Sequence, residues 1–296
     1  MIIYLQKQEN YYLDIQIISM YKAEEVILKI ENLSVGYKDK SGNVKMILKD
    51  VNLSENDIIR DGVQATGQAI AIIGRSGRGK STLFKCLTGL LKPISGQILL
   101  NNFNLETKED LKIVSEGSIG FVDQRYTLFR HKTVMQVCRY AIRKSDISKE
   151  EKEKLINEGL NNWELFEHRN KYPNELSGGQ KQRTAILEQI LTSKKIMILD
   201  EPTSGLDSVA INMVKNSFNK ILNSNEYNTI IFSTHNIEFA VEMADSIYVI
   251  GFPEDSKEYS TIIKHYDLKA MGMAWQEFGL NHLNLVKEIK DVLAKS

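Results

Sequence analysis

The sequence has few cysteines, no long apolar run and no excess of either charge. Two cysteines among 296 residues are too few for a disulfide framework and favour a reducing cytoplasm. Cys86 and Cys138 have hydrophobic or basic neighbours, as buried or incidental thiols commonly do. Lys+Arg and Asp+Glu are balanced at 38 each, so no overall field draws the chain to nucleic acid or to an acidic membrane. We therefore expect no direct nucleic-acid partner.

Targeting and membrane-spanning signals are also missing. Residues 1–25 lack a basic region followed by an unbroken apolar core and a cleavage site, so we predict an N-terminal extension and not a signal peptide. The longest apolar runs, AIAII (69–73) and IMIL (196–199), are far shorter than the ~20 residues that cross a bilayer. If the protein works at a membrane, we expect another chain to span it.

Short strands and helices alternate along most of the chain and predict an α/β fold. Residues 26–37 and 44–53 are predicted strands, and the turn DKSGN between them favours an antiparallel β subdomain at the N-terminal side. The strand–helix–strand repetition that follows requires right-handed crossovers in a mostly parallel sheet. Its segments are the strand 69–74, the helix 80–90, the strand in KPISGQILL (92–100), the helix 179–191, the strand KIMILD (195–200), the helix 208–222 and the strand NTIIFSTH (228–235).

Residues from about 128 to 178 interrupt this alternation and are predicted to form an inserted helical subdomain. Their charged segment DISKEEKEKLINEGLNNWELF (146–166) favours a helix with a solvated face. No internal repeat, proline-rich linker or low-complexity tract is visible. Residues 251–296 are predicted to form a C-terminal helical tail.

The segment GRSGRGKST fits the phosphate-binding pattern G-x-x-x-x-G-K-[ST], directly after a strand and at the start of a helix. Its glycines permit a tight loop whose N–H groups wrap a β-phosphate, while Lys80 reaches the β/γ oxygens and Ser81 offers a hydroxyl to Mg²⁺. The alternative is a glycine-rich turn with an incidental lysine, which the strand–helix context disfavours. The predicted phosphate-binding residues are Gly74, Arg75, Ser76, Gly77, Arg78, Gly79, Lys80, Ser81 and Thr82.

A second element of a phosphate site is IMILDE, an apolar strand that ends in Asp200 and Glu201. Ligands of open α/β sheets bind at the carboxyl ends of the strands. Asp200 is predicted to hold Mg²⁺, and Glu201 to polarise a water for attack on the γ-phosphate. A helix cap or a solvated turn would explain an isolated acidic pair, but the phosphate loop favours the catalytic interpretation.

The segment LSGGQ (176–180) lies 96 residues after Lys80 and 20 before IMILDE. Its two glycines fit either an ordinary turn or a backbone cradle for a phosphate at a helix N-terminus. With the other two motifs in the same order, it resembles the signature motif of ATP-binding cassette (ABC) ATPases. The resemblance covers roughly residues 26–250, which it identifies as a P-loop nucleotide-binding domain for ATP and Mg²⁺.

The resemblance implies roles for further residues. Gln124 resembles the glutamine that touches Mg²⁺ and the attacking water. Asp207 in SGLD (204–207) resembles the residue that lies across the dimer seam, and His235 resembles the histidine that contacts the γ-phosphate. Tyr37 lies 37 residues before Gly74, with the apparent insertion SENDIIRDGVQATGQ (54–68) between them. It is either the aromatic residue that stacks on adenine or a plain strand-end tyrosine.

In this family two nucleotide domains stack head to tail, so the resemblance implies that one subunit's signature closes over ATP held by the other. Closure on ATP binding and reopening on hydrolysis are then the working cycle. The signature residues that would act on the second subunit's ATP are Ser177, Gly178, Gly179 and Gln180.

Transport is the favoured function, because only 53 residues separate Gln124 from Ser177 and no sustained heptad pattern fills that interval. The alternative is a soluble ABC ATPase in DNA repair, defence or cofactor assembly. A transport ATPase implies separate permease subunits, an external solute-binding protein for an importer, and a peripheral place on the inner face of the cell membrane. The motifs and the tail AMGMAWQEFGL (270–280) are similar to nitrate-, sulfonate- and taurine-type importer ATPases. Cargo, direction, and pairing with an identical or a different cassette stay open.

The predicted permease contact is the segment RYTLFRHKTVMQV (125–137), which mixes apolar and basic side chains. A locally packed loop is the alternative. Phe129 is the residue whose removal is expected to weaken assembly while sparing nucleotide binding.

Overall fold

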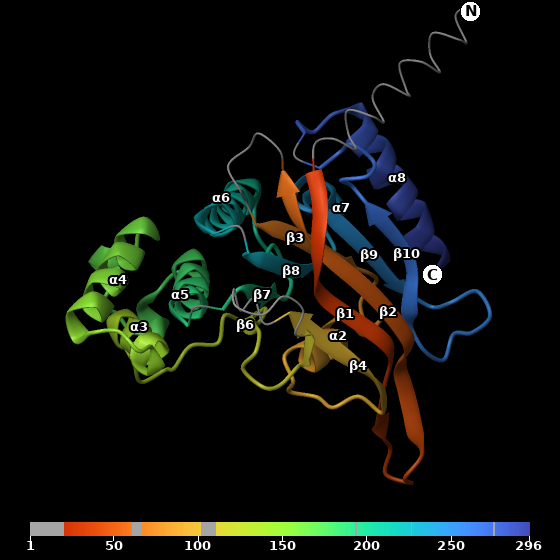
Figure 1. The fold of residues 1–296 in the computed structure, drawn as a ribbon, viewed down its shortest axis with the longest axis horizontal. Coiled ribbons are helices and arrows are strands. Elements are labelled where there is room, and N and C mark those ends of the chain that lie inside the picture. The colour runs from red at the N-terminus through yellow and green to blue at the C-terminus, as the bar shows by residue number, and fades with distance from the viewer. Residues whose placement is uncertain (1–20, 61–66, 102–110, 193, 226, 275) are drawn as a thin grey trace, which may run out of the picture.

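The computed structural model describes residues 21–60, 67–101, 111–192, 194–225, 227–274 and 276–296 (Figure 1). The strands are β1 (Tyr21–Lys38), β2 (Val44–Arg60), β3 (Gln68–Ile73), β4 (Ser95–Asn101), β5 (Leu111–Ile113), β6 (Gly120–Val122), β7 (Ile196–Leu199), β8 (Thr229–Thr234), β9 (Ser246–Gly251) and β10 (Thr261–Asp267). The α-helices are α2 (Lys80–Leu87), α3 (Val134–Ala141), α4 (Lys149–Asn162), α5 (Gly178–Leu191), α6 (Ser208–Ser224), α7 (Ile237–Met243) and α8 (Leu280–Lys295). Two sheets result, with strand orders β2-β1-β4-β5 and β10-β9-β3-β8-β7-β6.

The N-terminal hairpin confirms the predicted antiparallel subdomain. β1 and β2 pair antiparallel down to Lys38 and Val44. The Asp39 carboxylate closes the turn by accepting hydrogen bonds from the backbone N–H groups of Ser41 at 2.8 Å and Asn43 at 2.9 Å. β1 already begins at Tyr21, inside the predicted N-terminal extension, whose residues 1–20 lie outside the described part.

One expectation about a strand is wrong. The strand in KPISGQILL does not join the parallel sheet: β4 pairs antiparallel with β1, with Ile30 opposite Ile98. Only Ile98 and Leu100 of β4 are buried, which is the one-sided pattern of an antiparallel sheet and not the continuous burial of a parallel one. In the segment 54–68, β2 continues to Arg60 and β3 begins at Gln68, while residues 61–66 lie outside the described part; that the segment is an insertion stays a prediction.

The six-stranded sheet confirms the predicted parallel core. β3, β6, β7, β8 and β9 run parallel, and β10 is antiparallel to β9. All residues of β3 are buried, and alternate ones enter different cores. Ile70 and Ile72 face α2 and the antiparallel sheet, while Ala69, Ala71 and Ile73 join the core formed with the helices on the other face.

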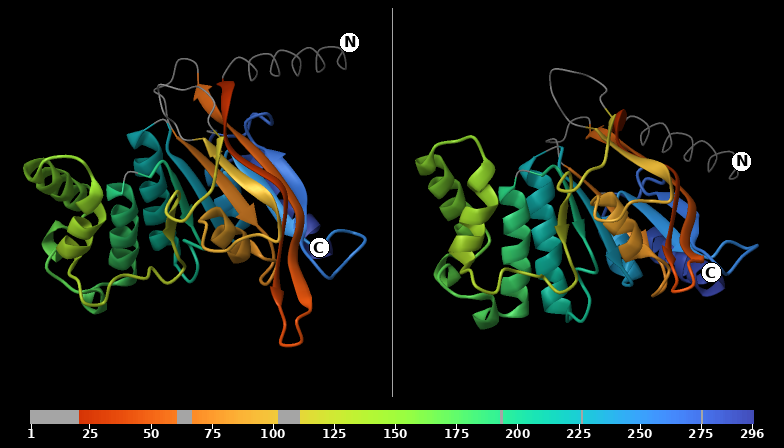
Figure 2. Two further views of the ribbon diagram at one scale, coloured as in Figure 1. Left: turned by 60° about the horizontal axis from the view of Figure 1, so that its bottom comes forward. Right: turned by 90° about the horizontal axis from the view of Figure 1, so that it is seen from below.

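The helices confirm the predicted subdomain organisation. α2 is packed between the two sheets through Leu83, Phe84 and Leu87. It ends three residues earlier than predicted, and Gly89 follows with a φ of +73°. α3 and α4 lie together away from the sheets, next to α5 (Figures 1 and 2), so the inserted segment forms a helical layer at one end of the molecule.

The C-terminal tail is not only helical. After β9 the chain returns as β10, which extends the central sheet, before α8 packs with Leu285, Val286 and Ile289 into the same core as α7. The tail is therefore continuous with the α/β domain. None of the helices in the described ranges is long and apolar enough to cross a bilayer.

The two thiols are buried, as predicted. Burial raises the pKa of Cys86 to about 11 and that of Cys138 to about 12. Both side chains therefore stay protonated at neutral pH and serve as small core residues.

Candidate functional site

The loop between β3 and α2 is shaped by glycine. Gly77 and Gly79 have φ values of +80° and +92°, a region that side chains rarely adopt. A Cβ on Gly79 would also lie 2.8 Å from Cδ2 of Leu48. Gly79 caps α2 without any side-chain hydrogen bond, so the first amides of the helix are left for an anion.

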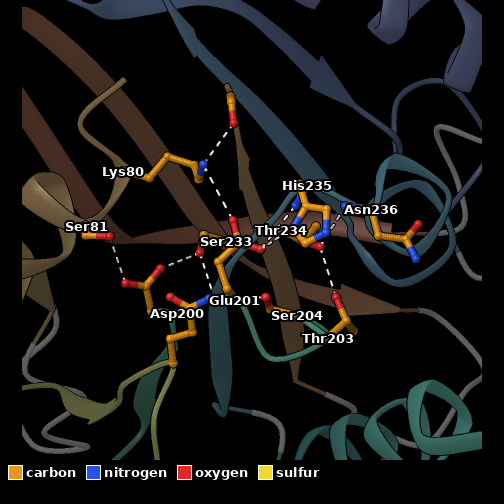
Figure 3. Close-up of polar contacts among 12 residues, drawn as sticks. Lys80, Ser81, Asp200, Glu201, Thr203, Ser204, Ser233, Thr234, His235 and Asn236 are labelled. Atoms are coloured by element: carbon orange, nitrogen blue, oxygen red, sulfur yellow. Dashed lines mark hydrogen bonds and ion pairs between the residues drawn. The ribbon is translucent and has the colours of Figure 1, made fainter. Parts of the chain in front are cut away.

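Lys80 points into the site from the first turn of α2 (Figure 3). Its buried ammonium donates to the carbonyl oxygen of Gly74 at 2.8 Å and lies 3.5 Å from Oε1 of Glu201. The buried Lys80 cation is thus held by a backbone dipole and one carboxylate. This places the ammonium beside the amides of the loop, where phosphate oxygens would bind.

Asp200 is positioned by two hydroxyl groups. Ser81 Oγ donates to its Oδ2 at 2.9 Å, and Ser233 Oγ donates to its Oδ1 at 2.6 Å. A hydroxyl, a buried carboxylate and the nearby Gln124 amide form an oxygen donor set that fits Mg²⁺, an ion usually bound through one or two carboxylates plus substrate phosphates. The donors therefore fit the predicted metal.

Glu201 is held in an unusual backbone conformation, with a φ of +51°. Its N–H donates to Ser233 Oγ at 2.9 Å, and its Oε2 lies 2.8 Å from Nδ1 of His235 (Figure 3). The backbone of His235 also donates to that oxygen, at 3.3 Å. Ser233 of β8 thus holds the backbone of Glu201, and two contacts from His235 fix the direction in which the carboxylate points.

These groups surround one pocket of about 470 Å³ at the carboxyl ends of β3, β7 and β8. Gln124, which follows β6, also reaches it and donates through Nε2 to Ser204 Oγ at 3.1 Å. The pocket is lined by Ile47, Ser76, Gly77, Arg78, Gly79, Lys80, Ser81, Thr82, Gln124, Asp200, Glu201, Ser204 and His235. Most residues predicted from the phosphate loop and from IMILDE are thereby brought together, along with Gln124 and His235.

Other predicted residues lie outside this pocket. Tyr37, next to the end of β1 and 43% exposed, does not line it, whereas Ile47 of β2 does. Arg75 lines an adjoining pocket instead. Gly74 contributes only the carbonyl that holds Lys80. Asp207 accepts a hydrogen bond from Ala210 N at 2.8 Å and so caps α6.

The signature segment is also outside the pocket of its own chain. Ser177 caps α5 and forms a capping box with Gln180. Around Gly178 and Gly179 an added Cβ would meet nothing within 4 Å among the described atoms. The signature is thus a rigid, open helix start, and its glycines are not required by packing within this chain.

Sequence reasoning missed Ser233, although it binds both Asp200 and the backbone of Glu201. The strand order could have indicated it. β7 and β8 are parallel neighbours, and Leu199 lies opposite Phe232, so the next residues, Asp200 and Ser233, are also neighbours. Ile47 was missed because the motifs do not indicate which side chain of the hairpin faces the loop. Ser204 was noticed only as part of SGLD.

Comparison with known proteins agrees with this geometry. A family model described as ABC transporter matches residues 62–204. The arginine transport ATP-binding protein ArtM of Bacillus subtilis is 35% identical over 222 residues, which cover 75% of this chain and 86% of ArtM. The energy-coupling factor transporter ATP-binding protein EcfA2 of Clostridium tetani is 34% identical over 228 residues, which cover 75% of each chain.

Solved structures lead to the same family. CbiO1 from Clostridium perfringens, part of the ABC transporter complex cbiONQ, matches with a TM-score of 0.65 and 28% identity over 92% of this chain and all of its own. The ATP-binding cassette MJ0796, a dimer in a post-hydrolysis state with ADP and Pi, matches with a TM-score of 0.60 and 28% identity, covering 82% of this chain and 99% of its own. The chain therefore belongs to the ABC transporter family and is one of its ATP-hydrolysing subunits.

Proposed function

We propose that this chain powers solute import by closing, with a second nucleotide-binding subunit, around two ATP molecules and driving a separate membrane permease. The carrying observation is that one chain holds a nearly complete phosphate and metal half-site together with a signature that faces no site of its own. The name of one relative, the sulfate/thiosulfate import ATP-binding protein CysA of Synechocystis sp., supports import. An external solute-binding protein would then deliver the solute.

In the proposed reaction the loop amides and Lys80 bind the β- and γ-phosphates. Ser81, Asp200 and Gln124 hold Mg²⁺, which neutralises phosphate charge when bound. Glu201 orients and polarises the attacking water, and His235 keeps that carboxylate in place and contacts the γ-phosphate. The hydrogen bond at 2.8 Å between the two side chains is the geometric basis for this pairing.

The second subunit supplies the missing wall. Ser177, Gly178, Gly179 and Gln180 of one subunit would close over the γ-phosphate bound by the other, with Asp207 at the seam. Open space around both glycines lets backbone N–H groups approach the anion closely. A Gly179→Ala variant should therefore fold normally, and yet its added methyl group should hinder closure of the two subunits.

The site is linked to the helical subdomain through the segment that follows Glu201. Both Tyr126 Oη, at 3.1 Å, and Gln182 Nε2, at 3.2 Å, donate to the carbonyl of Pro202. Burial raises the pKa of Tyr126 to about 12, so its hydroxyl remains a donor at neutral pH. These two hydrogen bonds would couple a change at the γ-phosphate to α5 and to the segment after Gln124.

Beside this link lies a basic groove of about 590 Å³, which we propose as the permease contact. Its cations are Arg125, Arg130 and Lys181. Phe129 is 38% exposed and packs edge-on against Tyr140, with ring centroids 5.1 Å apart, so it flanks the groove without lining it. A permease segment with apolar and acidic side chains would match this surface.

The proposed domain boundaries follow from this assignment. Residues 26–250 would carry the nucleotide-binding motifs, with the helical subdomain at about 128–178, and the tail 251–296 would complete the same domain through β10 and α8. The protein would lie on the inner face of the cell membrane, bound to its permease. Tyr37 does not line the pocket, so it would reach adenine only if the tip of the β1–β2 hairpin moved. Ile47 already lines the pocket and would contact the nucleotide without such a movement.

The test is a purification from membrane and soluble fractions. Tagged Glu201→Gln protein, with ATP present, should co-purify a multi-span membrane protein identified by mass spectrometry. The matched control carries Arg125→Glu and Arg130→Glu in addition. It should still dimerise with ATP but lose the membrane protein. Recovery only from the soluble fraction, with nucleic acid or assembly factors, would favour the alternative class of soluble ABC ATPases.

A further inference from the structure

A second pocket, of about 650 Å³, lies behind the phosphate loop. It is lined by Arg75 and Arg78 of the loop, by the β9–β10 connection and by the end of α8. The last two lie near each other in Figure 1. Its volume is within the range of small-molecule sites. It shares only Arg78 with the ATP pocket, so a ligand there would not be the catalytic nucleotide.

The charge of this pocket is strongly one-sided. The ionisable side chains in its lining are Arg75, Arg78, Lys257, Lys264, Lys295 and Glu254. Among the described residues none of the five cations forms an ion pair with an Asp or Glu side chain, and only Arg78 contacts the main-chain oxygen of Ser296, the last residue of the sequence. Five like charges around one cavity repel each other, and a bound anion would relieve that repulsion.

Arg78 connects the two pockets. Its guanidinium stacks over the Phe252 ring at 3.7 Å, and Nη2 donates to a main-chain oxygen of Ser296, the last residue of the sequence, at 3.5 Å. Its Nε is buried without a hydrogen-bond partner. A guanidinium with a spare buried donor is suited to an anion that enters from the second pocket. Because Arg78 belongs to the loop that holds ATP, such an anion would also act on that loop.

We propose that this pocket binds a small dissolved anion with several negative charges, of the phosphorylated or polycarboxylic class, and that its occupancy changes nucleotide affinity through Arg78. The chain then carries a regulatory site in addition to its ATP site. This inference does not rest on the direction of transport or on the permease.

The first experiment measures binding by calorimetry with inorganic tripolyphosphate as the probe. The full chain is saturated with ADP without Mg²⁺, so the catalytic pocket is occupied and the probe is not chelated. One site is expected. Lys257→Ala with Lys264→Ala should weaken it at least about tenfold, as the loss of two charge-assisted contacts implies. Lys149→Ala with Lys154→Ala, the same charge change on exposed α4 positions, should leave it unchanged.

The second experiment measures the coupling. Tripolyphosphate should change the Kd for ADP at least about fivefold more in the parent than in Lys257→Ala with Lys264→Ala, which keeps the phosphate loop and therefore any direct competition there. Arg78→Ser should show no more change than that lysine variant. No binding to the ADP-saturated chain, or equal weakening in both lysine pairs, would overturn the site. Coupling that persists in Arg78→Ser would overturn the assigned route. Both experiments measure binding, so a finding that the protein does not hydrolyse ATP would leave both results valid.

Discussion

Two glutamates in this protein have nearly the same neighbours in very different surroundings. Glu201, at the edge of the parallel sheet, lies 3.5 Å from the ammonium of Lys80. Glu55, on β2 between the sheets, lies 3.4 Å from the ammonium of Lys269. Each of the two clusters also contains a histidine and a serine. Residue types alone therefore do not distinguish the catalytic cluster from the structural one.

Access and backbone geometry make the difference. Glu201 borders a pocket and has a φ of +51°, and its partner His235 is 65% exposed. Glu55 has a side chain only 4% exposed, and its neighbour His265 lies 4.0 Å away, stacked at 4.2 Å on the ring of Tyr248. A strained, open carboxylate is available for chemistry, whereas an enclosed one joins β2 to the tail.

The largest expected difference is in the rate of ATP hydrolysis. Glu201→Gln should lower kcat by about 10²- to 10⁴-fold, because it removes the group that polarises water, while ATP binding is retained. Glu55→Gln should leave kcat per folded molecule close to the parental value. Steady-state ATPase assays with parallel ATP-binding measurements check both. Parental hydrolysis in Glu201→Gln would contradict the assignment of the base.

The second difference is in stability. Lys269→Met should lower the free energy of unfolding by about 3–5 kcal/mol, because it leaves the Glu55 carboxylate buried without its cation. Urea denaturation measures this. Combining Lys269→Met with Glu55→Gln should recover much of the loss. Lys80→Met should instead abolish nucleotide binding with a smaller stability change, since Glu201 opens onto a pocket. Equal stability losses in the two lysine variants would remove the distinction.

The third difference concerns the two serines. Ser233 binds Asp200 and the N–H of Glu201, whereas Ser246 Oγ accepts from the Lys269 ammonium at 3.2 Å. Ser233→Ala should raise the Mg²⁺ concentration for half-maximal ATPase by roughly tenfold, as loss of a hydrogen bond to a charged group implies. Ser246→Ala should lower stability without moving that concentration. An unchanged Mg²⁺ requirement in Ser233→Ala would show that Asp200 does not depend on it.

How much of this could be read from the sequence depends on the kind of contact. The phosphate loop, Asp200 and Glu201 were predicted, because each follows an apolar strand and parallel strands end at one edge, while the family resemblance implied His235. Glu55 and Lys269 were not, because they are 214 residues apart in the chain and belong to no motif. Tyr37 stays a prediction. The sheet to which β4 belongs was predicted wrongly, since local pattern does not specify a strand's partner.

The smallest expected difference is in the pH dependence of stability. Burial lowers the pKa of His265, against the opposing effects of Glu55 and Asp267, while Lys269 lowers it further. The native state therefore resists the proton that the unfolded chain accepts below about pH 6.5, and stability falls as pH drops through that range. His265→Gln should make the fall between pH 7 and 5.5 shallower, by less than the 1.4 kcal/mol per pH unit of one full proton, because His265 is partly exposed. Urea denaturation at several pH values measures the slope, with the exposed His131→Gln as the control. Equal slopes in the parent and in His265→Gln would show that His265 accepts a proton as readily in the folded protein as in the unfolded chain. The contrast with the open cluster would then rest on Lys269 alone.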